Sequence, residues 1–199
     1  MKCLVICLLR NHIKVDEVNM LRKLLHLAGI VIPVIYLLTD KQTAITVTAG
    51  ILVIDIILEA LRIKGILKLP FIEQNMKKQE RRRLSGSFFY ILSSFIAMAL
   101  FEKNIAISSL FILSISDPLS SVLGSRFGRV RFLGKSLEGA LAFFFSSFFI
   151  LLAFSFTIPI AVAGAVIASL TELFSSWPID DNLSIPLVTA LALTLLTRI

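Results

Sequence analysis

Seven long apolar segments divide most of this 199-residue chain. Each is close to the roughly 20 residues that a helix needs to cross the hydrocarbon core of a bilayer. Backbone polar groups find no partners in lipid, so only helices and closed barrels span it. The pattern therefore predicts an all-α fold, a polytopic integral membrane helical bundle with about seven transmembrane helices. The segments lie at 21–39, 43–61, 85–101, 105–123, 137–156, 158–176 and 183–198.

The composition excludes an ordinary soluble domain. Hydrophobic residues make up 57% of the chain and charged residues only 17%, and the mean hydropathy is +0.91. Soluble domains carry about a quarter charged residues. The net charge of +7 would suggest nucleic acid in a soluble protein, but here the cations lie between apolar segments. We therefore expect anionic lipid or nucleotide phosphates as partners and no nucleic acid.

The positions of the cations predict the topology. Of the 20 lysines and arginines, all but Lys41, Lys103 and Arg198 lie at or before the start of the first segment, or in the second-to-third and fourth-to-fifth connections. The positive-inside rule then places the N-terminus in the cytoplasm. We expect residues 1–20 to be a cytoplasmic extension, with the choice of Met1 or Met20 as the start left open. Residues 21–199 are expected to form one transmembrane domain.

The stretch from Asp117 to Gly139 is the strongest candidate site. Asp117 lies inside an apolar segment, where a carboxylate is costly and indicates function by default. Ser120, Ser121, Gly124 and Gly128 follow at helical offsets, and Pro118 predicts a kink. A small-residue packing seam, with Asp117 paired to a buried cation, is the structural alternative. Four cations fill the connection that follows, at Arg126, Arg129, Arg131 and Lys135.

The same connection resembles a phosphate-binding P-loop without matching one. Gly128 to Ser136 has five residues between its glycines where a P-loop has four, and it follows a membrane helix where a P-loop follows a strand. We exclude a P-loop fold. The chemistry of phosphate binding remains available, because glycines expose backbone N–H groups and Lys135, Arg129 and Arg131 supply charge-assisted hydrogen bonds.

Further polar residues lie at or near the ends of other segments. Arg22, Lys23 and His26 share one side of the first segment, where snorkelling cations are the structural alternative. Asp55 and Glu59 share a face of the second segment, and Arg62 or Lys64 is a candidate partner for Glu59. Glu172 is expected deep in the sixth segment. The acidic stretch Asp180-Asp181-Asn182 precedes the seventh segment and is either part of the site or only a helix N-cap.

Five sequence elements follow one another in a recognisable order. They are Arg22-Lys23-x-x-His26, Glu80 through Ser85-Gly86, Asp117 with Gly124 and Gly128, Lys135-Ser136-Leu137-Glu138-Gly139, and Asp181-Asn182-Leu183-x-Ile185-Pro186. Together they resemble the CTP-dependent polyprenol kinases, a family that includes dolichol kinase, phytol kinase and CTP-dependent diacylglycerol kinase and is related to the phosphatidate cytidylyltransferases. The resemblance covers residues 17–197, and Ser85 and Ser120 are mild departures from the family pattern.

The resemblance implies a kinase that transfers a phosphoryl group from CTP to a membrane lipid alcohol such as a polyprenol, dolichol or phytol, with a divalent cation such as Mg²⁺ and an active site on the cytoplasmic face. The implied metal ligands are Asp117, Asp181 and Asn182. The implied nucleotide-binding residues are Gly124, Gly128, Arg129, Lys135, Ser136 and Gly139. Asp117, Lys135, Glu138 and Asp181 are the implied catalytic residues, and Glu138 is either a metal ligand or the proton acceptor. Arg22, Lys23, His26, Glu80 and Gly86 are expected at the mouth where the substrate arrives.

Two other functions remain open at this point. A phosphatidate-type cytidylyltransferase would release pyrophosphate and form a CDP-lipid, but the Asp-Arg-x-Asp element of that family is replaced here by Asp-Asn-Leu. A transporter would use acids on several segments to line an ion path, but the polar clusters gather at one surface. The sequence does not indicate the oligomeric state.

Overall fold

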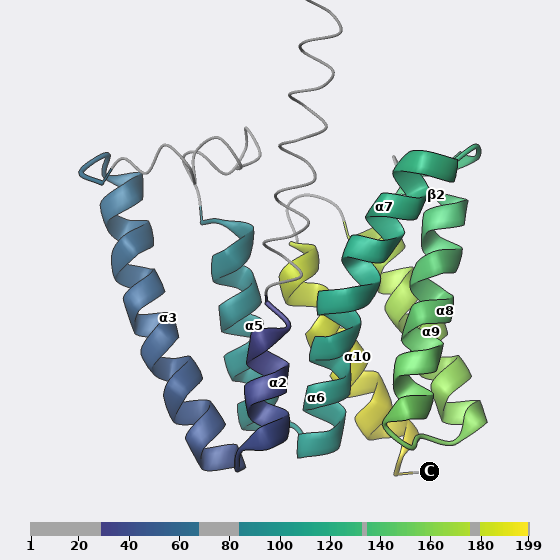
Figure 1. Cartoon of the computed structure of the whole chain (residues 1–199), viewed down its shortest axis with the longest axis horizontal. Helices are drawn as coiled ribbons and strands as arrows, with labels where there is room; N and C mark the ends of the chain where they lie inside the picture. The colour runs from purple at the N-terminus through teal and green to yellow at the C-terminus, as the bar shows by residue number, and fades with distance from the viewer. Residues whose placement is uncertain (1–28, 68–83, 133–134, 176–179, 199) are drawn as a thin grey trace, which may run out of the picture.

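A computed structural model of the chain describes residues 29–67, 84–132, 135–175 and 180–198. These residues are mostly helical, as predicted, and the one departure from an all-α fold within them is a pair of two-residue strands (Figure 1). The helices and strands are α2 (Val31–Leu38), α3 (Lys41–Ile63), α5 (Gly86–Leu100), α6 (Lys103–Phe111), the π-helix η2 (Ile112–Ser116), α7 (Asp117–Phe127), β1 (Arg131–Phe132), β2 (Lys135–Ser136), α8 (Leu137–Ala153), α9 (Ile158–Phe174) and α10 (Asp181–Leu196).

Two helices are long and apolar enough to cross a membrane, namely α3 and the continuous helix Lys103–Phe127 that α6, η2 and α7 form together. The apolar helices α5, α8, α9 and α10 are shorter. Each of them falls within a few residues of a predicted segment. The helices indicate a membrane protein, and the bundle of seven spans with a cytoplasmic N-terminus stays a prediction.

Polar residues in the connections fix where several helices begin. Asp40 accepts a hydrogen bond from the backbone N–H of Thr43 at the start of α3, at 2.9 Å. Ser85 accepts one from the backbone N–H of Phe88 at the start of α5, at 3.3 Å. A side-chain oxygen at this position satisfies one of the N–H groups that a helix leaves unpaired in its first turn. The short polar connections of the sequence therefore define the helix starts.

The π-helix η2 interrupts the long helix Lys103–Phe127 directly before Asp117. Pro118 follows in the first turn of α7. Proline has no N–H, and its ring clashes with the carbonyl four residues earlier, which here belongs to Ser114. The irregularity predicted from Pro118 is thus present, as a widened helical turn on its N-terminal side.

The apolar core lies where α8, α9 and α10 pack against η2. Leu113, Phe143, Leu151 and Leu193 are fully buried there. A second cluster around Tyr36, Met98 and Leu110 joins α2, α5 and α6. By contrast, α3 exposes a run of large apolar side chains from Ile51 to Ile63, and it lies at the edge of the bundle in Figure 1. A helix with this much exposed apolar surface is suited to contact lipid.

A buried ion pair ties α3 to the start of α5. Arg62 Nη2 lies 2.6 Å from Glu59 Oε2, and both side chains are almost fully buried. The backbone N–H of Ser85 donates to the same Glu59 oxygen at 3.2 Å. Arg62, one of the two expected partners of Glu59, is therefore confirmed. Asp55, one turn earlier, has one buried carboxylate oxygen without a hydrogen-bond partner among the described residues.

Candidate functional site

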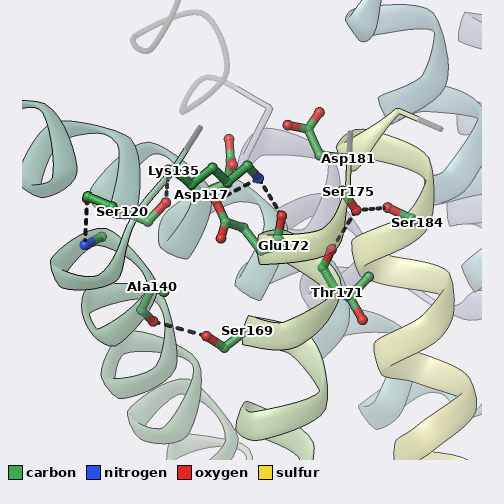
Figure 2. Close-up of polar contacts among 12 residues, drawn as sticks. Asp117, Ser120, Lys135, Ala140, Ser169, Thr171, Glu172, Ser175, Asp181 and Ser184 are labelled. Carbon is green, nitrogen blue, oxygen red and sulfur yellow. Dashed lines mark hydrogen bonds and ion pairs between the residues drawn. The ribbon is translucent and has the colours of Figure 1, made fainter. Parts of the chain in front are cut away.

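The strands β1 and β2 pair in an antiparallel hairpin. The candidate site lies at the end of the bundle where α7 and α9 finish and where this hairpin, α8 and α10 begin (Figure 1). The described cations at this end are Arg62, Lys64, Arg126, Arg129, Arg131 and Lys135, whereas the opposite end carries Lys41, Lys103 and Arg198. Asp117, Lys135, Glu172 and Asp181 come from four different elements, and Figure 2 shows them together at the site end. The described parts of the second-to-third and fourth-to-fifth connections and the start of α10 therefore share one end of the bundle, whereas residues 1–28 and 68–83 lie outside the described residues.

An ion pair between Lys135 and Glu172 is the centre of this site. The Lys135 ammonium donates to Glu172 Oε1 at 2.9 Å, and it also donates to the backbone carbonyl of Glu172. The Glu172 side chain is 7% exposed and that of Lys135 is 28% exposed. Glu172 Oε2 is buried and has no hydrogen-bond partner among the described residues. A buried carboxylate requires compensation of its charge, and Lys135 supplies it.

Glu172 lies in the last turn of α9, so the expectation that it sits deep in its segment is wrong. The predicted segment extended to residue 176, but α9 ends at Phe174 and turns through Ser175. The Ser175 hydroxyl donates to the carbonyl of Thr171 at 2.6 Å and contacts Ser184 Oγ of α10 at 2.6 Å. These contacts hold the end of α9 against the start of α10. Glu172 consequently faces the polar end of the bundle.

Asp117 is the first residue of α7 and is half-buried. Figure 2 shows it in the same group as Lys135 and Glu172. The Ser120 hydroxyl donates to the carbonyl of Asp117 at 3.0 Å, which reinforces the first turn of α7. Ser120 is buried but Ser121 is exposed, so the small-residue face of this helix is narrower than the sequence offsets predict.

The glycines of this region are required for close packing. A Cβ atom on Gly128 would lie 2.3 Å from the carbonyl oxygen of Gly124 and 2.6 Å from Ser136 Cβ. A Cβ on Gly124 would lie 2.5 Å from Ser136 Oγ, and one on Gly139 would lie 2.9 Å from the Ser120 carbonyl oxygen. Ser136 is the N-cap of α8 and accepts a hydrogen bond from the Gly139 N–H at 3.1 Å. The packing seam considered as the structural alternative is therefore present for the glycines.

Glu138 braces the hairpin from the first turn of α8. Its Oε1 accepts hydrogen bonds from the backbone N–H groups of Arg129, at 2.9 Å, and Val130, at 3.4 Å. The second oxygen, Oε2, is buried without a hydrogen-bond partner among the described residues. One Glu138 oxygen is thus committed to the backbone of the loop, a role that the sequence reasoning did not include.

The acidic stretch before α10 forms the N-cap that was one of its two interpretations. Asp180 Oδ1 accepts from the backbone N–H and from the side-chain amide of Asn182, both at 2.9 Å. Asp181 Oδ1 also accepts from the Asn182 N–H, at 3.1 Å. In Figure 2 the Asp181 carboxylate points toward the open end of the bundle. The N-cap is Asp180, so the capping role does not exclude a second role for Asp181, which is the first residue of α10.

Two hydroxyl side chains of α5 form hydrogen bonds with the start of α10 and with η2, and sequence reasoning missed these contacts. The Ser93 hydroxyl donates to the carbonyl of Asn182 at 2.7 Å. The Tyr90 hydroxyl donates to the carbonyl of Gly29 at 2.7 Å and lies 2.7 Å from the hydroxyl of Ser114 in η2. The sequence feature that could have predicted these contacts is the presence of several hydroxyl side chains in an otherwise apolar segment, because buried hydroxyl groups need hydrogen-bond partners.

Four of the predicted substrate-mouth residues, Arg22, Lys23, His26 and Glu80, lie outside the described residues. The fifth, Gly86, is the first residue of α5 and follows its cap, Ser85. The start of α5 belongs to the same end of the bundle as the candidate site (Figure 1).

The carboxylate oxygens at this end of the bundle are the type of ligand that a hard divalent cation prefers. Mg²⁺ prefers oxygen ligands such as carboxylates, and Asp117, Asp181 and the unengaged oxygen of Glu172 are of this kind. Within the described part of the chain, no three His, Cys, Asp or Glu side chains gather closely enough to hold a metal ion by themselves. A cation here would also need ligands from substrate phosphates or water, which is the usual arrangement for Mg²⁺.

Comparison with known proteins identifies several relatives of this chain. A protein of Rickettsia prowazekii described as uncharacterized is 31% identical over 188 residues, which cover 87% of this chain and 92% of that protein. A second uncharacterized protein, from Methanocaldococcus jannaschii, is 30% identical over 85% of this chain and 89% of its own length.

A CTP-dependent diacylglycerol kinase of Schizosaccharomyces pombe is 29% identical over 140 residues, covering 61% of this chain and 64% of the kinase. No family model and no solved structure matches the chain. The chain therefore belongs to one family with the Rickettsia and Methanocaldococcus proteins, and its sequence is related to those of the CTP-dependent lipid kinases.

Proposed function

We propose that this protein is a CTP-dependent lipid kinase that transfers the γ-phosphoryl group of CTP to the hydroxyl of a membrane lipid alcohol. The observation that carries the proposal is the similarity to a CTP-dependent diacylglycerol kinase over 61% of the chain. The cluster of cations and carboxylates at one end of the bundle supports it, because phosphoryl transfer asks a protein mainly for positioning and for neutralisation of charge.

In this proposal the CTP phosphates approach the hairpin and the start of α8. An ammonium group has three N–H donors, and Lys135 directs two of them to Glu172. The third is available for a phosphate oxygen. Arg129 and Ser136 are the neighbouring donors, while Gly124, Gly128 and Gly139 allow the backbone segments that carry these donors to approach each other closely.

Asp117, Asp181 and Asn182 are proposed to hold the divalent cation, with the unengaged oxygen of Glu172 as an additional candidate ligand. When bound, Mg²⁺ would neutralise charge on the transferring phosphates. Glu138 or one of the two aspartates would accept the proton of the lipid hydroxyl. Of these, Glu138 uses one oxygen to bind the loop backbone, and Asp181 uses one to accept from the Asn182 N–H.

Two classes of acceptor are candidates. The five sequence elements resemble a family that includes dolichol, phytol and diacylglycerol kinases, so an isoprenoid alcohol and diacylglycerol both fit the resemblance, and the fungal relative is named for diacylglycerol. Either lipid would reach the site from the bilayer between helices. We propose that Arg22, Lys23, His26, Glu80 and Gly86 lie where its headgroup arrives, on the cytoplasmic face.

The test is an assay of purified protein in mixed micelles with radiolabelled CTP, ATP, GTP or UTP. Polyprenol, phytol, geranylgeraniol and diacylglycerol serve as acceptors, and Mg²⁺ is present or chelated. The proposal predicts a phosphorylated lipid and CDP. Pyrophosphate with a CDP-lipid would instead establish a cytidylyltransferase. Absence of any nucleotide-dependent product, together with cation flux in vesicles, would establish a transporter.

Two substitutions test the site assignment within this assay. Asp117→Asn and Lys135→Ala should each lower kcat by at least about 10²-fold, the loss typical of removing one electrostatic contact to a transition state. Lys64→Ala removes an exposed lysine at the same end of the bundle, and Asp40→Asn changes a carboxylate at the opposite end. Both controls should keep their activity, and membrane insertion should be unchanged in all four. Full activity of Asp117→Asn and Lys135→Ala would refute the assignment.

A further inference from the structure

The last turn of α7 and the chain that follows it through β1 expose both cations and large apolar side chains. We name this surface, formed by Arg126, Phe127, Val130, Arg131 and Phe132, the basic hairpin surface. Phe127 is 62% exposed, Val130 54% and Phe132 48%. Arg126 and Arg131 are also exposed. Three large apolar side chains are thus exposed within six consecutive residues, and exposed apolar surface of this kind indicates a binding partner or a membrane.

The surface lies at the level where a membrane-crossing helix leaves the hydrocarbon. The continuous helix Lys103–Phe127 has 25 residues, which corresponds to about 37 Å at a rise of 1.5 Å per residue. The hydrocarbon core of a bilayer is only about 30 Å thick. The last turn of α7 and the hairpin that follows it therefore reach the headgroup region. Figure 1 shows the hairpin at the outer edge of the bundle, above the ends of α7 and α8.

The backbone that carries these side chains is held in place by hydrogen bonds. Glu138 binds the N–H groups of Arg129 and Val130, and the Leu137 N–H donates to the Val130 carbonyl at 3.0 Å. Arg131 pairs with Ser136 and Phe132 pairs with Lys135 across the two strands. The exposed side chains consequently project from a fixed loop, so their exposure is a property of the fold and not of a frayed end.

We propose that the basic hairpin surface binds the headgroups of anionic phospholipids. Arginine forms paired, charge-assisted hydrogen bonds with phosphate, and each cation near an anionic membrane favours binding by about fivefold. Aromatic rings are enriched at the boundary between headgroups and acyl chains, which suits Phe127 and Phe132. No carboxylate is present between Arg126 and Phe132 to oppose an anionic lipid.

This assignment separates two kinds of cation in one connection. Lys135 turns inward to Glu172, whereas Arg126 in the last turn of α7 and Arg131 in β1 are exposed. A lipid bound by these two arginines would hold the strand pair at the membrane surface and thereby steady the strand that bears Lys135. The proposal concerns lipid binding only and stands whether or not the protein is a kinase.

Tryptophan fluorescence tests the proposal without an activity assay. The chain has a single tryptophan, so a Trp177→Phe background with Phe132→Trp places one fluorophore on the surface. The full-length protein is reconstituted into phosphatidylcholine bilayers that contain equal mole fractions of brominated phosphatidylglycerol or brominated phosphatidylcholine. We expect quenching by both lipids, and stronger quenching by the brominated phosphatidylglycerol.

Charge variants in this background identify the source of the preference. Arg126→Gln and Arg131→Gln should each reduce the preference for phosphatidylglycerol by up to about fivefold. Arg198→Gln, a matched change of an exposed arginine at the opposite end of the bundle, should leave it unchanged. The proposal is overturned if both brominated lipids quench equally, if neither quenches, or if the preference survives the loss of both Arg126 and Arg131. The emission maximum of each variant verifies that the probe environment, and hence the fold of the hairpin, is retained.

Discussion

Lys135 and Glu172 are 37 residues apart in the chain and form the central contact of the candidate site. Neither residue satisfies the other completely: the ammonium keeps one donor, and the carboxylate keeps one buried oxygen that has no hydrogen-bond partner among the described residues. A pair in this state can add a third, charged group without being broken. Glu138, by comparison, has one oxygen bound to the hairpin backbone and contributes to the site by holding the loop that carries Lys135.

The first prediction concerns Glu172. Replacement by Gln preserves the shape of the side chain and removes the charge that anchors the Lys135 ammonium. Misplacement of a phosphate-binding group by about 1 Å can cost about 10²-fold in rate, so Glu172→Gln should lower kcat/KM for CTP by about that factor. Steady-state kinetics measures the change. Glu102→Gln, an exposed glutamate at the opposite end, is the matched control, and equal activity of the two variants would contradict the prediction.

The second prediction concerns the buried pair of Glu59 and Arg62. Arg62→Gln leaves the Glu59 carboxylate buried without its guanidinium, and loss of one partner from a buried pair typically costs about 3–5 kcal/mol. The free energy of unfolding, measured in mixed micelles with increasing sodium dodecyl sulfate, should fall by about this amount. The double variant Glu59→Gln/Arg62→Gln removes both charges and should recover much of the loss. A double variant less stable than Arg62→Gln would argue against this electrostatic origin.

At the scale of secondary-structure elements, the site depends on how closely α7 approaches the hairpin and the start of α8. The approach is possible because Gly124, Gly128 and Gly139 have no side chains, as the built Cβ distances show. Gly50, in the middle of α3, has no atom within 4 Å of a built Cβ. Close packing therefore requires the three glycines near the hairpin, and it does not require Gly50.

The third prediction compares these two kinds of glycine. Gly128→Ala would place a Cβ 2.3 Å from a backbone oxygen, so the hairpin must move; overpacking of this type costs about 1–3 kcal/mol. Gly50→Ala fills open space and improves helix propensity, so its stability should be unchanged or higher by up to about 1 kcal/mol. Unfolding in mixed micelles measures both. A greater loss of stability for Gly50→Ala than for Gly128→Ala would contradict the assignment.

At the scale of the whole molecule, the helices alternate in direction so that the candidate site, the N-caps of α5, α8 and α10, and most described cations share one end (Figure 1). The opposite end is formed by the short turns after α2, α5 and α8. Such a separation of charge between the two ends is what the positive-inside rule describes, and it supports a cytoplasmic site.

The fourth prediction tests this topology. The two native cysteines, Cys3 and Cys7, are replaced by Ser, and one new cysteine is introduced at exposed Ser125, near the site, or at exposed Ser155, between α8 and α9. A membrane-impermeant maleimide applied to intact cells should label the Ser155→Cys variant and not the Ser125→Cys variant, and inverted vesicles should give the opposite result. The same labelling pattern for both positions would exclude an odd number of crossings between them.

Sequence reasoning located most of the candidate site because charged residues are rare in this chain and stand out against apolar segments. Asp117, Lys135 and Asp181 were found in that way and share one end of the bundle. It did not find the brace by Glu138 or the contact of Lys135 with Glu172, since both depend on the path of a two-stranded hairpin that has no sequence periodicity. The support from Tyr90 and Ser93 was also missed, because a buried hydroxyl in an apolar segment resembles any other small polar residue until its partner is known.

The π-helix divides one long helix into two parts that pack against different neighbours. On its N-terminal side α6 packs against α2, α5 and α10, and on its C-terminal side α7 packs against α8 and β2. A π-turn accommodates one more residue than an α-turn, and one residue corresponds to about 100° of rotation. The π-helix therefore rotates α7 about the helix axis relative to α6. The side of α6 that packs is determined by the core of the bundle, whereas α7, which begins at Asp117, presents a different side to the hairpin. One continuous helix can in this way orient Asp117 toward the site without changing how α6 packs in the core.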